Sequence, residues 1–282
     1  MKCNYFMKIS VIIPTYKPQD YLWECLNSLV AQTFPKEDFE VILVLNGCCE
    51  PWKSNIQQYI DARMQGMNVN YIQTDEGGVS NARNIALDCA KGDYVTFIDD
   101  DDFISPTYLE ELYDKATPDT VSLCYPYAFN DGKIEEQLPY SVTEAYNYCI
   151  EYGCTTLASR ARKYFSGPWM KLIPMSFIQG KKFDKQFKIG EDSLFMFLIS
   201  DKIHKLSYTS KNAKYYRRYR ENSASFKKRT IQEQVINNVK LICEYIKIYA
   251  HGGYSSYIFA TRIASRIREI VLFPVTLFKK NN

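Results

Sequence analysis

Four consecutive aspartates are the part of this sequence best suited to bind a metal ion. Asp99, Asp100, Asp101 and Asp102 directly follow residues 94–98, which have the composition of a buried strand. Carboxylates packed this closely repel one another, and their burial is unfavourable without a cation. Mg²⁺ takes one or two protein carboxylates and completes its octahedron with phosphate oxygens. The run therefore predicts a divalent metal, Mn²⁺ or Mg²⁺, beside a diphosphate, with a solvated acidic loop as the alternative.

A second acidic pair, Glu191 and Asp192, precedes the apolar residues 194–198, which are expected to form a buried helix. Asp192 is placed to cap this helix, because its carboxylate would accept hydrogen bonds from the backbone N–H groups ahead of it. A carboxylate in a partly dry cleft would instead take the proton of an attacking hydroxyl as a general base. The two roles coexist only if Asp192 points into the cleft.

Alternating strand and helix patterns in the first hundred residues predict where these acids lie. The expected strands are residues 8–13, 39–45, 68–73 and 94–98, and the first is expected to stop at Pro14. Apolar stripes at helical spacing fall between them. This order implies a mostly parallel sheet with ligands bound at the carboxyl ends of its strands. One rim is therefore predicted to carry residues 14–16, 46–47 and 99–102.

The rest of the chain is less regular. A helix is expected to open at Ser105-Pro106, with proline at its first position, and a strand at 120–125. Residues 126–190 are aromatic and irregular, and three helices are expected over 193–200, 231–249 and 254–279. The predicted fold class is α/β, a Rossmann-like, mostly parallel central sheet flanked by helices, with a C-terminal helical extension.

Composition and charge argue against several other classes of protein. The formal net charge is only +3, so nucleic-acid binding is not expected. Nine cysteines without a Cys-x-x-Cys pair and two separate histidines do not have the spacing of a zinc site. The odd number of cysteines and the polar start predict a cytoplasmic protein. No apolar run approaches the roughly 20 residues that span a bilayer.

Five collinear segments resemble the inverting family 2 glycosyltransferases, whose fold is called GT-A. The resemblance covers about residues 8–225 of the sequence. The matching segments are Ser10-Val11-Ile12-Ile13-Pro14-Thr15-Tyr16, Cys25-Leu26-x-Ser28-Leu29-x-x-Gln32-Thr33, Gly78-x-Ser80-x-Ala82-Arg83-Asn84, the run from Gly92 to Asp102, and Gly190-Glu191-Asp192-Ser193-Leu194-Phe195.

The resemblance implies a donor site for a nucleotide sugar. Thr15 and Tyr16 would line the nucleotide pocket, Arg83 would lie on the nucleotide side, and Asp99 would contact the ribose. Asp101 would be the metal ligand. The nucleotide-binding residues expected in this way are Pro14, Thr15, Tyr16, Asn46, Arg83, Asp99 and Asp100.

The resemblance also implies a catalytic group and an acceptor side. Asp192 resembles the catalytic base of the family, with Glu191 beside it. Trp169 could stack on a sugar face and Lys171 could meet a phosphate, although a core tryptophan and a surface lysine are the alternatives. Arg217 and Arg218, followed by Ser223, resemble a loop that closes over the diphosphate, for which a solvated basic loop is the alternative.

One departure from the family pattern concerns the base of the nucleotide. Family members usually carry Asp-Asp-Gly-Ser after the second strand, where this chain has Leu45-Asn46-Gly47-Cys48. The amide of Asn46 can accept a hydrogen bond from a uracil ring but can also donate one. A UDP-sugar is the favoured donor, with guanine and thymidine nucleotides left open.

The implied reaction is a single displacement that inverts the anomeric centre, in the synthesis of a glycan or polysaccharide. Residues 1–104 would bind the nucleotide sugar, residues 105–229 would form the acceptor-binding and catalytic half of the same domain, and residues 230–282 would extend it. A sugar nucleotidyltransferase normally has a glycine-rich loop after the first strand, and residues 14–18 contain no glycine. A non-catalytic nucleotide-sugar-binding protein would be expected to lack the aspartates or the base, and both are present.

The C-terminal segment alternates basic and apolar side chains, with Arg262, Arg266, Arg268, Lys279 and Lys280 on the basic positions. Such a segment can lie on an anionic membrane surface, which would place the enzyme at the inner face of a membrane and suit a lipid-linked glycan acceptor. A helix packed on the catalytic domain, with a solvated charged face, would have the same pattern.

Overall fold

The structure is a computed structural model that describes residues 7–220 and 230–280, with the side chains of residues 273–280 outside the description. Its strands are β1 (Ile9–Thr15), β2 (Phe39–Asn46), β3 (Asn68–Thr74), β4 (Tyr94–Phe97), β5 (Phe103–Ile104), β6 (Thr120–Leu123), β7 (Tyr125–Asn130), β8 (Lys171–Pro174), β9 (Lys205–Tyr208) and β10 (Lys214–Tyr219). Its helices are α1 (Tyr21–Val30), α2 (Trp52–Arg63), α3 (Val79–Cys89), α4 (Tyr108–Asp114), α5 (Ser141–Glu151), α6 (Met175–Ile178), α7 (Glu191–Leu198), α8 (Ile231–Ala250) and α9 (Ser256–Lys280), with short 3₁₀ segments η1 (Arg160–Ser166) and η2 (Ser200–Lys202).

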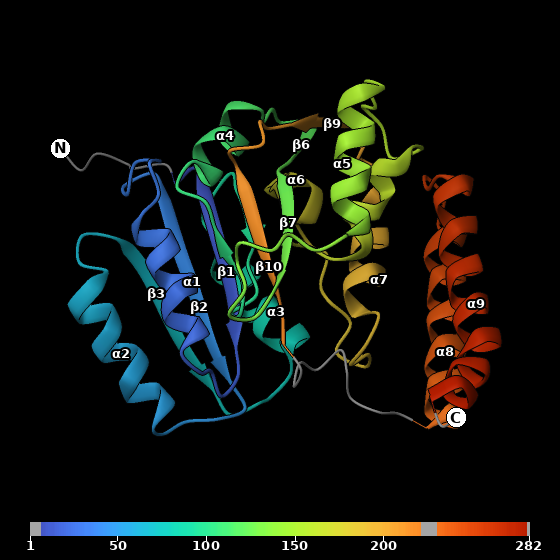
Figure 1. The fold of residues 1–282 in the computed structure, drawn as a ribbon, viewed down its shortest axis with the longest axis horizontal. Coiled ribbons are helices and arrows are strands. Elements are labelled where there is room, and N and C mark those ends of the chain that lie inside the picture. Colours follow the sequence, from blue (N-terminus) through green and yellow to red (C-terminus); the bar gives the residue numbers. More distant parts are fainter. Residues whose placement is uncertain (1–6, 221–229, 281–282) are drawn as a thin grey trace.

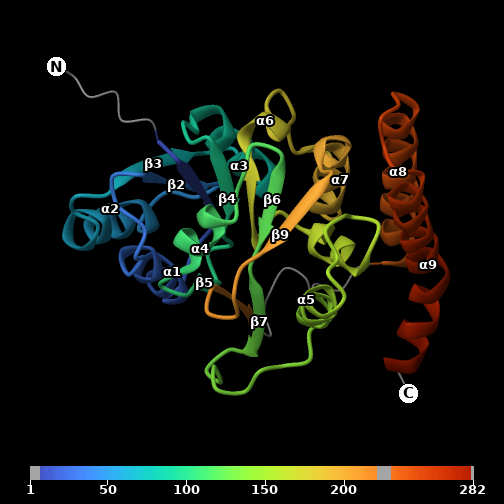
Figure 2. The same cartoon turned by 90° about the horizontal axis from the view of Figure 1, so that it is seen from above.

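A seven-stranded sheet forms the centre of the molecule, in the order β3-β2-β1-β4-β8-β6-β9, and a three-stranded sheet, β5-β10-β7, lies beside it. α1 and α4 cover one face of the large sheet, and α3 and α6 cover the other (Figure 2). α8 and α9 form a helical hairpin at one end, and α2 lies at the opposite end (Figure 1). The predicted α/β fold class, with helices at the C-terminal end, is confirmed.

The first four strands of the large sheet are parallel, as predicted, and the apolar runs of β1 and β2 are buried on both faces, whereas β3 at the edge is only half-buried. β1 pairs with β2 from Ile9 opposite Phe39, and with β4 from Ile9 opposite Tyr94. β8 interrupts the parallel order because it is antiparallel to both β4 and β6. Since β4 precedes residue 105 and β8 follows it, the two halves predicted as 1–104 and 105–229 share one sheet.

The expectation that Pro14 stops the first strand was wrong, because β1 continues to Thr15. Pro14 lies opposite Val44, and Thr15 lies opposite Leu45. The neighbour on the other side, β4, has already ended, since its last pair joins Phe97 to Ile12. A proline has no N–H to donate, so it fits where one side of the strand has no partner. β1 therefore carries the Thr15 side chain three residues beyond the last β1–β4 pair.

Several predicted boundaries in the second half are corrected by the structure. α4 begins at Tyr108 rather than at Pro106, residues 120–125 divide between β6 and β7, and the stretch expected to be irregular contains α5 and β8. α5 buries Ala145 and Tyr146. Its apolar stripe was not recognised in the sequence, because the tyrosines of this segment lie on buried and exposed positions alike. Local propensity did not separate these short elements, because long-range packing defines them.

The apolar stripe of α8 is only partly covered, contrary to the usual expectation for such a stripe. Val235, Ile242 and Tyr249 are half-buried, whereas Ile231, Val239 and Ile246 are exposed. The residues that α8 buries are Asn238, Leu241 and Tyr245, and the Tyr245 hydroxyl lies 2.8 Å from Ser193 Oγ at the start of α7. Val239 and Ile246 of the stripe are 47% and 50% exposed. None of the described helices combines the length and apolarity needed to cross a membrane.

Candidate active site

The aspartate run forms a tight turn at the carboxyl end of β4, on the lower edge of the sheet in Figure 1. The Asp102 backbone N–H donates to the Asp99 carbonyl at 3.0 Å, which folds the run back on itself. Asp102 is buried, and its carboxylate accepts from the Arg218 backbone N–H at 2.7 Å. One carboxylate oxygen from each of Asp99, Asp101 and Asp102 lies within 4.8 Å of the others. The predicted metal ligand Asp101 therefore belongs to a group of three convergent acids.

The electrostatics of this turn show an excess of negative charge. Burial, and after it the charge of the neighbouring Asp101, raise the pKa of Asp100 to about 7. Burial also raises the pKa of Asp101, with the charge of Asp99 adding to the effect, and raises that of Asp102 well above its usual value. Several carboxylate oxygens that converge, and whose negative charge is not fully neutralised by the protein, suit a hard divalent cation such as Mg²⁺ or Mn²⁺.

Arg83 joins the aspartate turn to the predicted base. It extends from α3, and its side chain is only 2% exposed. Its Nη2 lies 2.9 Å from Asp99 Oδ1, and its Nη1 lies 2.5 Å from Asp192 Oδ1. Its guanidinium carbon is also 5.3 Å from the centre of the Phe183 ring, which packs against it. The sequence placed Arg83 on the nucleotide side, whereas in the structure both arms of the guanidinium are bound to acids of the protein.

Asp192 does not cap its helix, so that expectation was wrong. α7 begins at Glu191 after Gly190, and no side chain caps its first turn. The Asp192 carboxylate, 18% exposed, is directed to Arg83 instead. Burial raises the pKa of Asp192, and the charge of Arg83 opposes that rise. Glu191 is buried next to it, with burial raising its pKa to about 7, so the pair is a compact acidic site.

The ends of β1 and β2 are tied to the same rim. Thr15 Oγ1 donates to Asp100 Oδ2 at 2.5 Å, next to Pro14. The buried Asn46 side chain donates to the Thr15 carbonyl at 2.7 Å and accepts from the Gly78 backbone N–H at 2.8 Å. Asn46 thus connects three loops of the rim, a role that the sequence did not reveal. Tyr16 is 54% exposed beside them.

Trp169 lies beside the aspartate turn, held by an unusual backbone. A backbone bridge joins Trp169 to Phe97, at the end of β4. The next residue, Met170, has a φ of 67°, in the left-handed region that side chains other than glycine seldom adopt. A Cβ on Gly167 would come within 2.2 Å of the Trp169 ring, so only glycine leaves room for the indole. This strained turn fixes the orientation of the indole.

Lys171 is a structural residue in this conformation, which differs from the expected contact with a phosphate. Its side chain is fully buried, and its Nζ donates to the carbonyls of Tyr164, Gly167 and Trp169 at 2.8, 2.7 and 2.5 Å. These three acceptors use all the protons of the ammonium group. Burial lowers the pKa of Lys171 to about 7. Lys171 therefore stabilises the turn that carries Trp169.

The two arginines expected in a loop over the diphosphate belong to strand β10. Arg217 donates to the Tyr140 hydroxyl at 2.7 Å, and its guanidinium lies 5.4 Å from the centre of a Trp169 ring. Arg218 is buried, with its guanidinium bound to Glu24, to Asp131 and to the Asp101 carbonyl. Arg218 therefore holds the aspartate turn from behind. Ser223 lies outside the described residues.

Arg220 is a site residue that sequence reasoning missed. Its Nε and Nη2 lie 3.0 and 2.5 Å from Asp101 Oδ2, and its guanidinium is stacked 4.1 Å from the centre of the Tyr21 ring. In the sequence, Arg220 belongs to a stretch rich in lysine and arginine between Lys211 and Arg229, and this clustering was a signal that could have drawn attention to it. Arg220 gives Asp101 a positive partner within the protein.

The comparisons with known proteins agree with this geometry. The sequence profile described as "Glycosyl transferase family 2" matches residues 10–205. The chain is 38% identical over 105 residues to "Poly(ribitol-phosphate) beta-N-acetylglucosaminyltransferase TarS" of Staphylococcus aureus, which covers 37% of this chain and 18% of TarS. It is 31% identical over 216 residues to a "Poly(ribitol-phosphate) beta-glucosyltransferase" of Bacillus spizizenii, covering 74% of this chain and 32% of the relative. The chain thus spans no more than about a third of the length of either relative.

A third relative is closer to this chain in length. The chain is 28% identical over 221 residues to the "GalNAc(5)-diNAcBac-PP-undecaprenol beta-1,3-glucosyltransferase" of Campylobacter jejuni, covering 77% of this chain and 67% of the relative.

Solved structures show the same fold. A crystal structure of S. aureus TarS 1-349 in complex with UDP-GlcNAc superposes with a TM-score of 0.70 and 25% identity, covering 93% of this chain and 72% of that one. The mannosyltransferase PcManGT of Pyrobaculum calidifontis, in complex with GDP-Man and Mn²⁺, gives a TM-score of 0.63 at 15% identity, over 98% of this chain and 75% of that one. The second likeness is one of fold alone. The predicted GT-A fold and the resemblance drawn from five motifs are confirmed, and this chain is a glycosyltransferase that belongs to glycosyl transferase family 2.

Proposed function

We propose that this enzyme moves a sugar from a UDP-sugar to a hydroxyl of a glycan acceptor, with inversion at the anomeric carbon. One observation carries the proposal: the buried guanidinium of Arg83 lies between Asp99 of the aspartate turn and Asp192 at the start of α7. Asp99, expected to contact the donor, and Asp192, expected to act as base, are therefore bridged by one side chain, although they are far apart in the sequence.

The donor would lie along the rim formed by the ends of β1, β2 and β4. Tyr16 is exposed there, Thr15 is bound to Asp100, and Asp99 leads the turn. A UDP-sugar is favoured because the TarS structure that resembles this chain holds UDP-GlcNAc. Asn46 would act on the nucleotide mainly by holding the loops of the rim in place, since its amide already joins Thr15 to Gly78.

Asp101 would hold a divalent metal together with Asp99 and Asp102, whose oxygens converge with its own. When bound, Mn²⁺ or Mg²⁺ would neutralise the charge that develops on the departing diphosphate. Arg220, which pairs with Asp101 in this structure, supplies part of the same positive charge from the protein.

Asp192 would take the proton from the acceptor hydroxyl as that oxygen forms its bond to the anomeric carbon. The bond between the anomeric carbon and the diphosphate oxygen breaks on the opposite face, and UDP leaves with the electron pair. The ionised form of Asp192 is required, and the adjacent Arg83 favours that form. Glu191 would support the base through its own charge, and no second nucleophile is needed.

The acceptor would approach the Trp169 side of the site. The indole is held by its turn and by Arg217, and an aromatic ring can stack on a sugar face. A glycan or lipid-linked glycan acceptor is proposed because relatives are named for poly(ribitol-phosphate) and for an undecaprenol-linked glycan. Residues 1–104 would bind the donor, residues 105–229 the acceptor, and residues 230–282 would form the extension. A cytoplasmic location stays a prediction.

The proposal is tested by incubating the chain with UDP-sugars and Mn²⁺ and measuring UDP release with and without glycan acceptors. Asp192→Asn should lower transfer about 10³-fold, the scale of a lost general base, while UDP affinity changes less than twofold. Asp101→Ala should weaken the Mn²⁺-dependent part of UDP binding. The exposed Asp88→Asn on α3 is the matched control and should change neither.

Other outcomes would point to different functions. Normal turnover by Asp192→Asn would show that Asp192 is not the general base. Unchanged metal dependence in Asp101→Ala would show that Asp101 is not a metal ligand. Pyrophosphate consumption would identify a nucleotidyltransferase. Binding of nucleotide sugars without UDP release would identify a binding protein.

A further inference from the structure

The contact between η1 and α9 gathers four arginines without acidic partners. Arg162 comes from η1, and Arg262, Arg266 and Arg268 come from α9. Across residues 7–220 and 230–272, none of the four forms an ion pair with an aspartate or glutamate. Arg262 donates to the Phe165 carbonyl and Arg266 donates to Asn238 Oδ1. Such a cluster is unfavourable without a counter-ion, because like charges repel and partial burial strengthens the repulsion.

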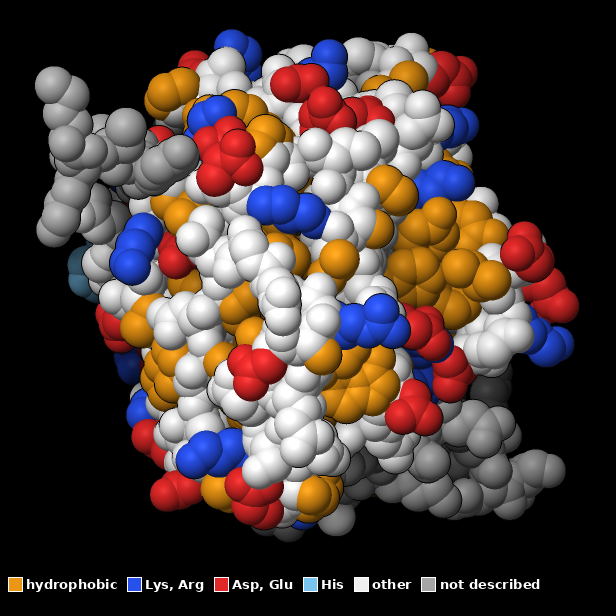
Figure 3. Space-filling view, turned by 90° about the vertical axis from the view of Figure 1, so that its left-hand side faces the viewer, with side chains coloured by type: hydrophobic (Ala, Val, Ile, Leu, Met, Phe, Trp, Pro, Cys, Tyr) orange, Lys and Arg blue, Asp and Glu red, His pale blue; other side chains and the backbone are white. Residues whose placement is uncertain are grey.

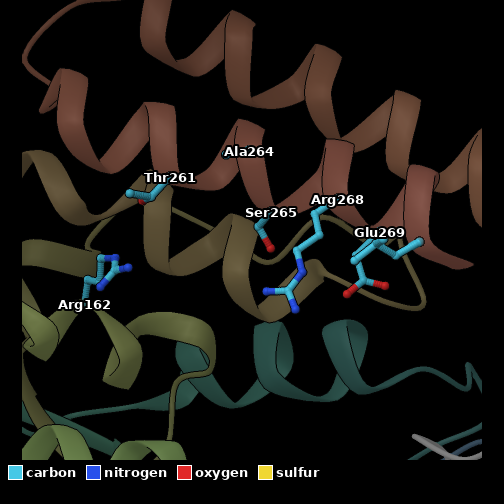
Figure 4. Close-up of a pocket in the computed structure, with 7 residues that line it drawn as sticks. Arg162, Thr261, Ala264, Ser265, Arg268 and Glu269 are labelled. Carbon is cyan, nitrogen blue, oxygen red and sulfur yellow. The ribbon is translucent and has the colours of Figure 1, made fainter. Parts of the chain in front are cut away.

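Two of these arginines line a pocket of about 590 Å³. Arg268 reaches into it from α9, and Arg162 approaches from the opposite wall, with the Thr261 and Ser265 hydroxyls between them (Figure 4). Its one acidic residue, Glu269, accepts a hydrogen bond from Gln234 of α8. Guanidinium groups and hydroxyls around an open space are the usual ligands of a phosphate group.

Arg262, one turn before Arg266 on α9, adds an independent observation. The Nε of Arg262 is buried and has no hydrogen-bond partner among the described residues. Burial lowers the pKa of Arg262, and the charges of Arg266 and Arg162 lower it further. An anion in the pocket would offset this positive charge.

Exposed apolar side chains lie on the same hairpin. Ile267 and Val271 of α9 are 50% and 61% exposed and are four residues apart, so they share a face of the helix. Val239 and Ile246 of α8 are similarly exposed and are seven residues apart. The opposite end of the molecule, with α2, shows apolar, basic and acidic side chains interspersed (Figure 3).

We propose that the α8–α9 hairpin docks on an anionic lipid bilayer, with the pocket between η1 and α9 binding a phosphate of a lipid headgroup. Residues 254–282 contain five arginines and lysines but one acidic residue, Glu269. A second copy of the chain would bring identical cations together across a two-fold axis, which is unfavourable. An anionic bilayer complements both the charge and the apolar side chains. This surface lies outside the transfer site and is independent of the proposed reaction.

Vesicle flotation tests this proposal. Vesicles of phosphatidylcholine mixed with phosphatidylglycerol should float the chain, and vesicles of phosphatidylcholine alone should not. Arg162→Gln/Arg268→Gln should lower the vesicle partition coefficient about thirtyfold, on the scale expected for two basic residues near an anionic surface. Ile267→Ser/Val271→Ser should also lower it. Arg63→Gln/Lys115→Gln, which removes two exposed basic residues elsewhere, is the matched control and should float like the parent.

Thermal melting shows whether each variant is folded, and a conservative Arg162→Lys/Arg268→Lys variant should keep most of the binding. Equal flotation of the parent and Arg162→Gln/Arg268→Gln would overturn the proposal, as would equal binding to neutral and anionic vesicles. Stabilisation by inorganic phosphate or by a soluble phosphodiester polymer through the two arginines, without flotation, would assign the pocket to free phosphate or to a glycan instead. None of these measurements depends on sugar transfer.

Discussion

Arg83 and Lys171 are two buried cations near the same site, but their partners differ in kind. Arg83 lies between two carboxylates that come from different parts of the chain. Lys171 binds three carbonyls of the turn in which it lies. A cation with carboxylate partners couples two functional regions, whereas a cation with carbonyl partners fixes the shape of one. The comparison shows that burial of a charge does not reveal its role until its partners are known.

Among changes to these two cations, the largest expected effect follows from changing the shape of the Arg83 side chain while keeping its charge. Lysine has a single ammonium group and cannot bind Asp99 and Asp192 with two separate arms. Arg83→Lys should lower kcat about 10²-fold, because small displacements of a catalytic group have costs of that size. Steady-state kinetics with a UDP-sugar would measure the change. Arg63→Lys on α2 is the control, and normal kcat in Arg83→Lys would show that the bridge is not needed.

Removing the Lys171 charge should instead affect stability. Lys171→Met keeps the length of the side chain but leaves three buried carbonyls without their donor, which should lower the free energy of unfolding by about 3 kcal/mol. Urea denaturation would measure this loss. Donor KM should stay within about twofold of the parent value. A large rise in donor KM without a loss of stability would instead support the contact between Lys171 and a phosphate that was expected from the sequence.

The smallest effect, taken per unit of pH, is a pH dependence of stability carried by Lys171. Its pKa is about 7 in the folded chain, against an ordinary value of 10.5. Between these values the unfolded chain binds a proton that the folded chain has lost, so the free energy of unfolding rises with pH, by at most about 1.4 kcal/mol per unit. The parent and Lys171→Met should therefore diverge from pH 7 upward. Parallel stability curves would mean that Lys171 stays protonated in the folded chain.

The sequence was sufficient for features that depend on local order along the chain. Strand and helix patterns located β1 to β4, and a parallel sheet brings the ends of its strands to one rim, so Asp99 and Thr15 were expected to be neighbours. The Glu191-Asp192 pair was expected just before a helix, and α7 begins two residues earlier than expected, at Glu191 itself. α5 and β8 were missed because their boundaries depend on contacts with residues distant in sequence.

The sequence alone determined the class of fold and the presence of acids suited to metal binding and proton transfer, because apolar periodicity and residue type are local properties. Only the tertiary structure decided the partners: Arg83 with Asp99 and Asp192, Arg220 with Asp101, and Lys171 with its three carbonyls. It also left part of the apolar stripe of α8 exposed, since the residues that α8 buries include Leu241 and Tyr245. Partners of buried charges depend on how distant segments pack, and no local pattern in the chain records that packing.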